Sequence, residues 1–135
     1  MKIVRKMKLS PKDMGEVCNE LDGYIWAVFD VAKGIMAAGD EYVFVLRDSL
    51  MSQHHSRPND IFGVGIDLKS GSCENLFLVN RLNETVSRNG SFDKNSEGRL
   101  NDLIYYFFEN LPAYAGIYDR PHYSRDELLR ALRRH

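Results

Sequence analysis

The residues best suited to chemistry lie in one long polar segment, residues 81–95. It holds Arg81, Asn83, Arg88 and Asn89. A guanidinium group can donate two parallel hydrogen bonds to a phosphate or a carboxylate, and an amide beside it can both donate and accept. These residue types predict a ligand-binding site for an anion or a nucleotide. The alternative is a solvated loop in which Asn and Ser fill turn positions.

A second candidate group is His54-His55, followed by Asp60. Histidine titrates near neutrality, so His55 and Asp60 are the candidates for a catalytic acid–base pair. Adjacent histidines point in different directions on most backbones, and no other ligand stands at a recognised zinc spacing. We therefore expect a surface histidine pair and no metal. The sequence has no phosphate-binding glycine loop, nucleophile elbow or zinc-knuckle pattern, and we predict no cofactor.

A carboxylate inside an apolar run is the third candidate. Asp30 lies late in a strand-like apolar segment, and Lys33 follows three residues later. A carboxylate in such a place needs a partner or has a shifted pKa. One interpretation is that Asp30, Asp60 or Asp67 contacts Arg81 at an edge of the sheet. The alternative is a structural ion pair or an aspartate that caps a turn.

The composition is that of one domain without an export signal. The chain has 135 residues, and 44% of them are hydrophobic. Its net charge of −1 gives no global electrostatic reason to bind nucleic acid or an anionic membrane. Cys18 and Cys73 are too few for a disulfide framework, and the apolar runs are far shorter than the ~20 residues of a spanning helix. We predict a cytoplasmic protein that does not enter a membrane.

The elements that must position these residues are organised around residues 60–68. Every second residue from Phe62 to Leu68 is large and apolar, and glycines stand between the first three of them. A period of two predicts a strand with one apolar face. The glycines leave the other face bare, so that a backbone, a helix or a ligand can approach closely. We predict that this strand is central and carries the core.

The remaining segments predict an α+β fold: a mostly antiparallel sheet of about five strands covered by two helices, with a C-terminal helical tail. Helix 96–111 has apolar residues at i, i+3, i+4, i+7, i+8 and i+11 and should lie across one face of the sheet. Gly34 and the β-branched residues disfavour a competing helix over 26–38. The expected segments are strand 2–8, helix 11–22, strands 24–31, 35–38 and 42–46, loop 48–59, strands 60–68 and 74–81, loop 81–95 and helix 96–111.

The C-terminal part predicts a partner surface. We divide the chain into a domain over 1–111 and an aromatic connector with a short basic helix over 112–135. In the connector, Tyr114, Ile117 and Tyr118 need an apolar surface to pack on, and we expect them to bind a partner protein or a second copy of the chain. Whether this tail packs in cis or in trans stays open. The arginines of the terminal helix suit acidic partners or nucleic acid; the alternative is a solvated face.

Four segments carry a resemblance to known proteins: 28–37, 56–66, Asn80-Arg81 and Ser87-Arg88-Asn89. Together they resemble one small bacterial family of uncharacterised proteins, a domain of unknown function. The resemblance covers about residues 10–111. The chain departs from the family pattern at Phe62-Gly63, where a Trp-Gly pair is usual, and at Leu82, where proline is usual. The resemblance implies a small cytoplasmic α+β domain and no established activity.

Two functions of different classes remain. The first is a non-enzymatic binding or regulatory domain whose tail docks a partner protein or a second copy. The second is a small toxin-like ribonuclease, or a nucleotide- or anion-binding enzyme, that uses His55, Arg81 and Arg88. The lack of a catalytic motif favours the first.

Overall fold

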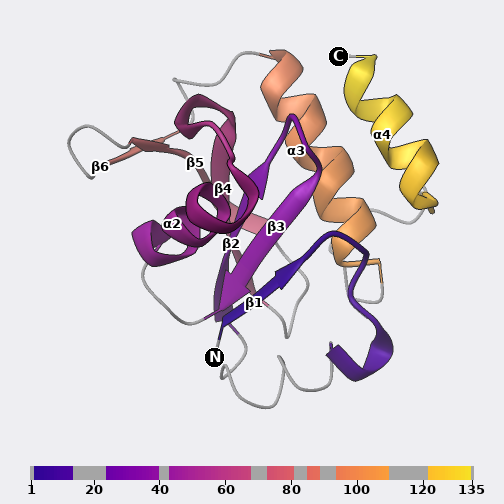
Figure 1. Ribbon diagram of the computed structural model, residues 1–135, viewed down its shortest axis with the longest axis horizontal. Coiled ribbons are helices and arrows are strands. Elements are labelled where there is room, and N and C mark those ends of the chain that lie inside the picture. Colours follow the sequence, from indigo (N-terminus) through magenta and orange to yellow (C-terminus); the bar gives the residue numbers. More distant parts are fainter. Residues whose placement is uncertain are drawn as a thin grey trace.

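A computed structural model describes residues 2–13, 24–39, 43–67, 73–80, 85–88, 94–109 and 122–134. These residues form one antiparallel sheet with helices packed against it (Figure 1). The strands are β1 (Lys2–Arg5), β2 (Tyr24–Asp30), β3 (Ile35–Gly39), β4 (Ile61–Asp67), β5 (Cys73–Asn80) and β6 (Thr85–Arg88). The helices are α2 (Val43–His54), the 3-10 helix η1 (Pro58–Asp60), α3 (Lys94–Phe107) and α4 (Arg125–Arg133).

The sheet confirms the predicted central strand. Its six described strands have the order β1-β3-β2-β4-β5-β6, and every neighbouring pair is antiparallel. β4 pairs with β2 on one side, with Phe62 opposite Phe29 and Val64 opposite Ala27, and with β5 on the other. Phe62, Val64 and Ile66 are all buried, as the period of two predicts. The α+β class and the antiparallel sheet are therefore confirmed.

The alternation of side chains divides the core between the two faces of the sheet. On β2, Ala27 and Phe29 belong to a cluster with α3, whereas Val28 belongs to a cluster with α2. Such a division follows because successive side chains of a strand point to opposite faces. Figure 1 shows the result, with α2 on one side of the sheet and α3 on the other.

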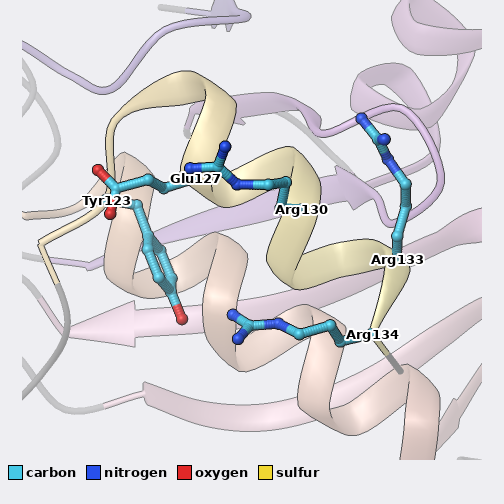
Figure 2. A pocket seen from close by; sticks show the side chains of 5 residues that line it. All are labelled: Tyr123, Glu127, Arg130, Arg133 and Arg134. Carbon is cyan, nitrogen blue, oxygen red and sulfur yellow. The ribbon is translucent and has the colours of Figure 1, made fainter.

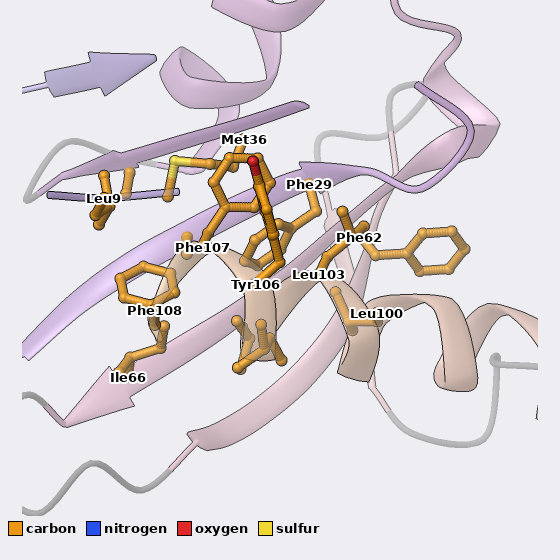
Figure 3. Packing of buried hydrophobic residues seen from close by; sticks show 14 of the residues in the cluster. Leu9, Phe29, Met36, Phe62, Ile66, Leu100, Leu103, Tyr106, Phe107 and Phe108 are labelled. Carbon is orange, nitrogen blue, oxygen red and sulfur yellow. The ribbon is translucent and has the colours of Figure 1, made fainter. Parts of the chain in front are cut away.

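Helix α3 provides the larger part of the core, as its amphipathic spacing predicts. Its apolar side chains pack on β2 and β4 (Figure 3). The rings of Phe107 and Phe108 lie 6.1 and 6.5 Å from the ring of Phe29. The described helix ends at Phe107, and Phe108 continues it with a hydrogen bond to Ile104. The buried residues of this segment are Leu100, Leu103, Ile104, Tyr106, Phe107 and Phe108.

The predicted strand 42–46 is wrong, because this segment begins helix α2. The run is rich in β-branched and aromatic residues, and local propensity therefore favoured a strand. The burial pattern is helical: Val43, Leu46 and Leu50 are buried at i, i+3 and i+7, and Val45 between them is 43% exposed. Packing of this apolar stripe on the sheet outweighs the strand propensity.

The two predicted loops also contain regular structure. Loop 48–59 holds the second half of α2 and the start of η1, and loop 81–95 holds β6 and the start of α3. β6 pairs with β5 in register, with Val79 opposite Val86, so backbone pairing gives this polar segment its structure. Polar composition alone therefore predicted loops too broadly.

The predicted start of helix 11–22 is confirmed within the described residues. Pro11 to Asp13 are helical, and Asp13 N–H donates to Ser10 Oγ over 3.0 Å. In return, Ser10 N–H donates to Asp13 Oδ2 over 3.2 Å. These reciprocal bonds satisfy two N–H groups that a helix start leaves unpaired. Residues 14–22, including Cys18, lie outside the described residues.

The turn between β2 and β3 requires glycine at position 34. Gly34 has a φ of +68°, and a Cβ atom there would lie 3.3 Å from Arg125 Nη1 and 3.4 Å from Leu132 Cδ1. We expect Gly34→Ala to lower the free energy of unfolding by about 1–2 kcal/mol, because an L-residue is strained in the left-handed region. Chemical denaturation measures this change. Ala32→Ser, at an exposed position of the same turn, is the control. Equal stability of the two variants would contradict the assigned turn.

Candidate functional site

Helix α4 is fixed to the domain by its apolar face. Ser124 and Glu127 form a capping box, in which Glu127 N–H donates to Ser124 Oγ over 3.2 Å and Ser124 N–H donates to Glu127 Oε1 over 3.2 Å. Leu128, Ala131 and Leu132 are buried, and both leucines join the cluster formed by α3 and the sheet. α4 lies beside α3 (Figure 1), so this part of the tail packs on its own chain.

A single arginine ties the start of α4 to the β2–β3 turn. Arg125 Nη1 donates to the carbonyl oxygen of Lys6 over 2.6 Å and to that of Gly34, and Arg125 Nη2 donates to that of Lys33 over 3.1 Å. A guanidinium presents several donors in one plane, which suits three carbonyl groups that converge. Arg125 therefore satisfies backbone oxygens of two separate segments and holds α4 against both.

Polar contacts secure the other sides of α4. Tyr123 OH donates to Asp102 Oδ1 over 3.1 Å, and Arg99 Nε donates to the carbonyl oxygen of Leu132 over 3.2 Å. Lys8 Nζ donates to the carbonyl oxygen of Tyr123 over 2.7 Å and also contacts Glu109. Burial raises the pKa of the Tyr123 hydroxyl, and the negative charge of Asp102 raises it further. Tyr123 therefore stays a neutral hydrogen-bond donor at physiological pH.

Helix α4 carries three exposed arginines that we call the basic face: Arg130, Arg133 and Arg134. They are offset by two residues from the buried trio of α4, which is about 200° around the helix axis. All three are exposed, and within the described residues none of their side chains makes a hydrogen bond or an ion pair. Four-residue and three-residue spacing keeps them on neighbouring parts of one surface.

The basic face borders a hollow of about 450 Å³ that Figure 2 shows from close by. Tyr123 and Glu127 complete its lining. In Figure 2 the side chains of Tyr123 and Arg134 lie on the side of α4 that faces α3, and Arg133 points away from them. Exposed guanidinium groups beside a tyrosine ring can bind carboxylates or phosphates, and the ring adds apolar contact.

The predicted ligand-binding and partner-binding residues lie mostly outside the described residues. This applies to Arg81, Asn83 and Asn89. Arg88 is the last residue of β6. Nothing in the described part of the chain bears on its side chain, so the anion site in this segment stays a prediction. The partner-binding residues Tyr114, Ile117 and Tyr118 also lie outside the described residues.

The candidate acid–base residues lie on different elements. His55 has a φ of +56° and follows the last residue of α2, where left-handed backbone commonly ends a helix. Lys33 Nζ donates to the carbonyl oxygens of His54 and His55 over 2.6 and 3.1 Å, which places a positive charge at the negative end of the helix dipole. Asp60 ends η1, and in the described residues its side chain makes no hydrogen bond with His55. Their catalytic role stays a prediction.

His54 is the histidine whose titration the structure alters. Burial lowers the pKa of His54, and the positive charges of Lys6 and Lys33 lower it further. The imidazole is therefore more strongly neutral at pH 7 than an exposed histidine. This property disfavours the charged form beside the lysine that caps α2.

Asp30 caps the β2–β3 turn, which confirms the structural alternative. Its Oδ1 accepts hydrogen bonds from the N–H groups of Ala32 and Lys33, each over 2.9 Å, and its carbonyl oxygen accepts one from Gly34 over 2.9 Å. The other carboxylate oxygen, Oδ2, is buried and has no hydrogen-bond partner among the described residues. Burial raises the pKa of the neighbouring Asp60, and the negative charge of Asp30 raises it further.

The described residues also limit two other kinds of site. They contain no group of three or more His, Cys, Asp or Glu side chains that could hold a metal ion. Over the same residues, every helix is too short or too polar to cross a bilayer. The basic face is therefore the strongest candidate site in the described part of the chain.

Comparisons with known proteins leave the site to be interpreted from its own residues. No protein-family model, no curated protein and no solved structure matches the chain. The spacing of Arg130, Arg133 and Arg134 was visible in the sequence as a basic helix. The sequence did not show that Arg125, on the same helix, has a different role. Arg125 binds backbone carbonyl groups of the domain.

The docking contact of α4 can be tested with two arginines of the same helix. We expect Arg125→Met to lower the free energy of unfolding by about 2 kcal/mol, because three backbone carbonyl groups lose a charged donor. Arg130→Met is the matched control and should change it by less than about 0.5 kcal/mol. Urea denaturation of the full chain measures both. Similar losses in the two variants would contradict the assigned role of Arg125.

The carboxyl pair gives a pH-dependent prediction. A carboxyl group whose pKa is raised on folding stabilises the folded state only at low pH, and this stabilisation is lost as pH rises through the folded-state pKa. Asp60→Asn should therefore raise the free energy of unfolding at pH 7. The gain should vanish below the ordinary aspartate pKa of 3.8, where Asp60 is protonated in both states. Denaturation at a series of pH values measures it, and a less stable variant at pH 7 would contradict it.

Proposed function

We propose that this protein is a small, cytoplasmic, non-enzymatic binding domain that holds an acidic segment of a partner protein on the basic face of α4. One observation carries the proposal. Arg130, Arg133 and Arg134 are exposed without an ion pair in the described residues, on a helix whose opposite side is buried. Rigid support lowers the entropic cost of binding, because the helix that carries these arginines is already docked on the domain.

The chemistry of the face suits carboxylates. Guanidinium groups donate paired hydrogen bonds to carboxylates, and Tyr123 beside them offers an aromatic surface of the kind found in protein interfaces. The net charge of the whole chain is −1, so the positive charge is local. A local cluster favours a short acidic protein segment over nucleic acid, for which a larger basic surface is typical.

The other functional predictions from the sequence are not tested by the described residues. The connector residues Tyr114, Ile117 and Tyr118 precede α4 in the chain, and their binding to a partner protein or a second copy stays a prediction. The resemblance to the bacterial family is consistent with a domain without a known activity and stays a prediction. The ribonuclease alternative with His55, Arg81 and Arg88 gains no support from the contacts of the described residues.

A peptide-binding experiment tests the proposal. The probe is a fluorescein-labelled peptide that alternates Glu with Tyr, and fluorescence anisotropy measures its affinity for the full chain. Changing Arg130, Arg133 and Arg134 together to Gln should weaken binding by about tenfold or more, since charge-assisted hydrogen bonds are lost. Raising the salt concentration should weaken binding to the unmodified chain but much less to this variant.

The control removes three exposed cations elsewhere. Changing Lys6, Lys12 and Arg57 together to Gln alters the net charge by the same amount. This control should keep most of the affinity. An equal loss of peptide affinity in both triple variants would show that binding depends only on net charge, and this result would overturn the proposal. Tighter binding of a single-stranded RNA oligonucleotide than of the peptide would also overturn it.

A further inference from the structure

A second hollow lies on the other side of Arg133. It measures about 600 Å³ and lies between the β2–β3 turn, α3 and α4. This volume lies in the range of roughly 300–1,000 Å³ that is usual for small-molecule sites. The residues that matter for its chemistry are the apolar Val31, Leu129 and Leu132 and the cationic Lys33, Arg99 and Arg133.

The floor of the hollow is part of the packed core. Val31 and Leu132 are buried, and Leu129 packs against the same cluster. Their positions are fixed by the sheet and by the docking of α4, so the apolar surface exists before any ligand arrives. An apolar group placed there gains contact with side chains that need not rearrange.

The rim of the hollow is positively charged and partly fixed. Lys33 Nζ donates to the carbonyl oxygens of His54 and His55 at the end of α2, so its charge lies near the hollow but is directed towards that helix. Arg99 Nε donates to the carbonyl oxygen of Leu132. Arg133 makes no hydrogen bond or ion pair in the described residues. Asp60 is near enough for Lys33 and Arg99 to act on its pKa, but it does not line the hollow.

We infer that this hollow binds a small organic anion: a carboxylate or phosphate monoester that carries a short hydrocarbon body. The anionic group binds Arg133, and the hydrocarbon body packs on Leu129 beside the buried side chains of Val31 and Leu132. Charge alone would suit inorganic phosphate, and the apolar floor alone would suit an alcohol. The combination selects a ligand that has both parts.

The inference is tested with four small probes on the full chain. Octanoate, octyl phosphate, octanol and inorganic phosphate are titrated, the first two below their micelle concentrations, while amide NMR shifts are followed. Octanoate and octyl phosphate should shift the amides of Val31, Lys33 and Leu129. Octanol and inorganic phosphate should each bind about tenfold more weakly or worse, since each lacks one part of the interaction.

Three variants locate the site. Arg133→Gln should weaken octanoate binding by about threefold to tenfold, and Leu129→Trp should abolish it by filling the hollow. Arg130→Gln is the matched control, because this arginine lies one turn earlier on α4 and does not line the hollow. It should bind octanoate as the unmodified chain does.

Four outcomes would overturn the inference. These are equal binding of octanol and octanoate, equal binding of inorganic phosphate and octyl phosphate, shifts confined to other parts of the chain, and unchanged octanoate binding by Leu129→Trp. The proposed peptide-binding function is independent of these results. Failure of the acidic peptide to bind leaves the octanoate test intact, because Val31, Lys33 and Leu129 line only the second hollow and Arg133 is shared by both.

Discussion

The docking of α4 on the β2–β3 turn is the interaction on which both candidate sites depend. The burial of Leu128 and Leu132 supplies the apolar part of this contact. Arg125 supplies the polar part by donating to carbonyl oxygens of the turn and of Lys6. If this contact were absent, the arginines of α4 would lie on a free peptide, and the second hollow would lose one of its walls.

The turn can receive α4 because its own conformation is fixed from within. Asp30 accepts hydrogen bonds from two backbone N–H groups of the turn, and Gly34 adopts a backbone conformation that other L-residues rarely take. Lys33, in the same turn, caps the end of α2 on the opposite layer. One four-residue turn therefore joins the helix layers on both faces of the sheet.

The parts of the fold with a strong local period were predictable from the sequence. The alternation around Val64 placed β4 in the core, and the spacing of apolar residues from Leu100 to Phe108 defined α3. The cap at Ser124 was recognisable because both partners of the box stand three residues apart. Helix α2 was missed, because Val43 to Leu46 favour a strand locally and become helical only through packing on the sheet.

The site was less predictable because its contacts join distant parts of the chain. The role of Asp30 as a turn cap could be predicted from the sequence, because its hydrogen-bond partners are two and three residues away. The partners of Arg125 lie 91, 92 and 119 residues away, and no local pattern separates this arginine from Arg130. The spacing of the basic face showed a charged surface, but only the fold shows which side of α4 remains exposed.

Native-state hydrogen exchange of individual amides tests the central claim most directly. If α4 is docked as an integral part of the domain, the amides of Ala131 and Leu132 should exchange only through global unfolding, with the same free energy as those of Val28 and Val64 in the central strands. Exchange of the α4 amides at a free energy close to zero, while the strands remain protected, would show a detached helix and would contradict the account.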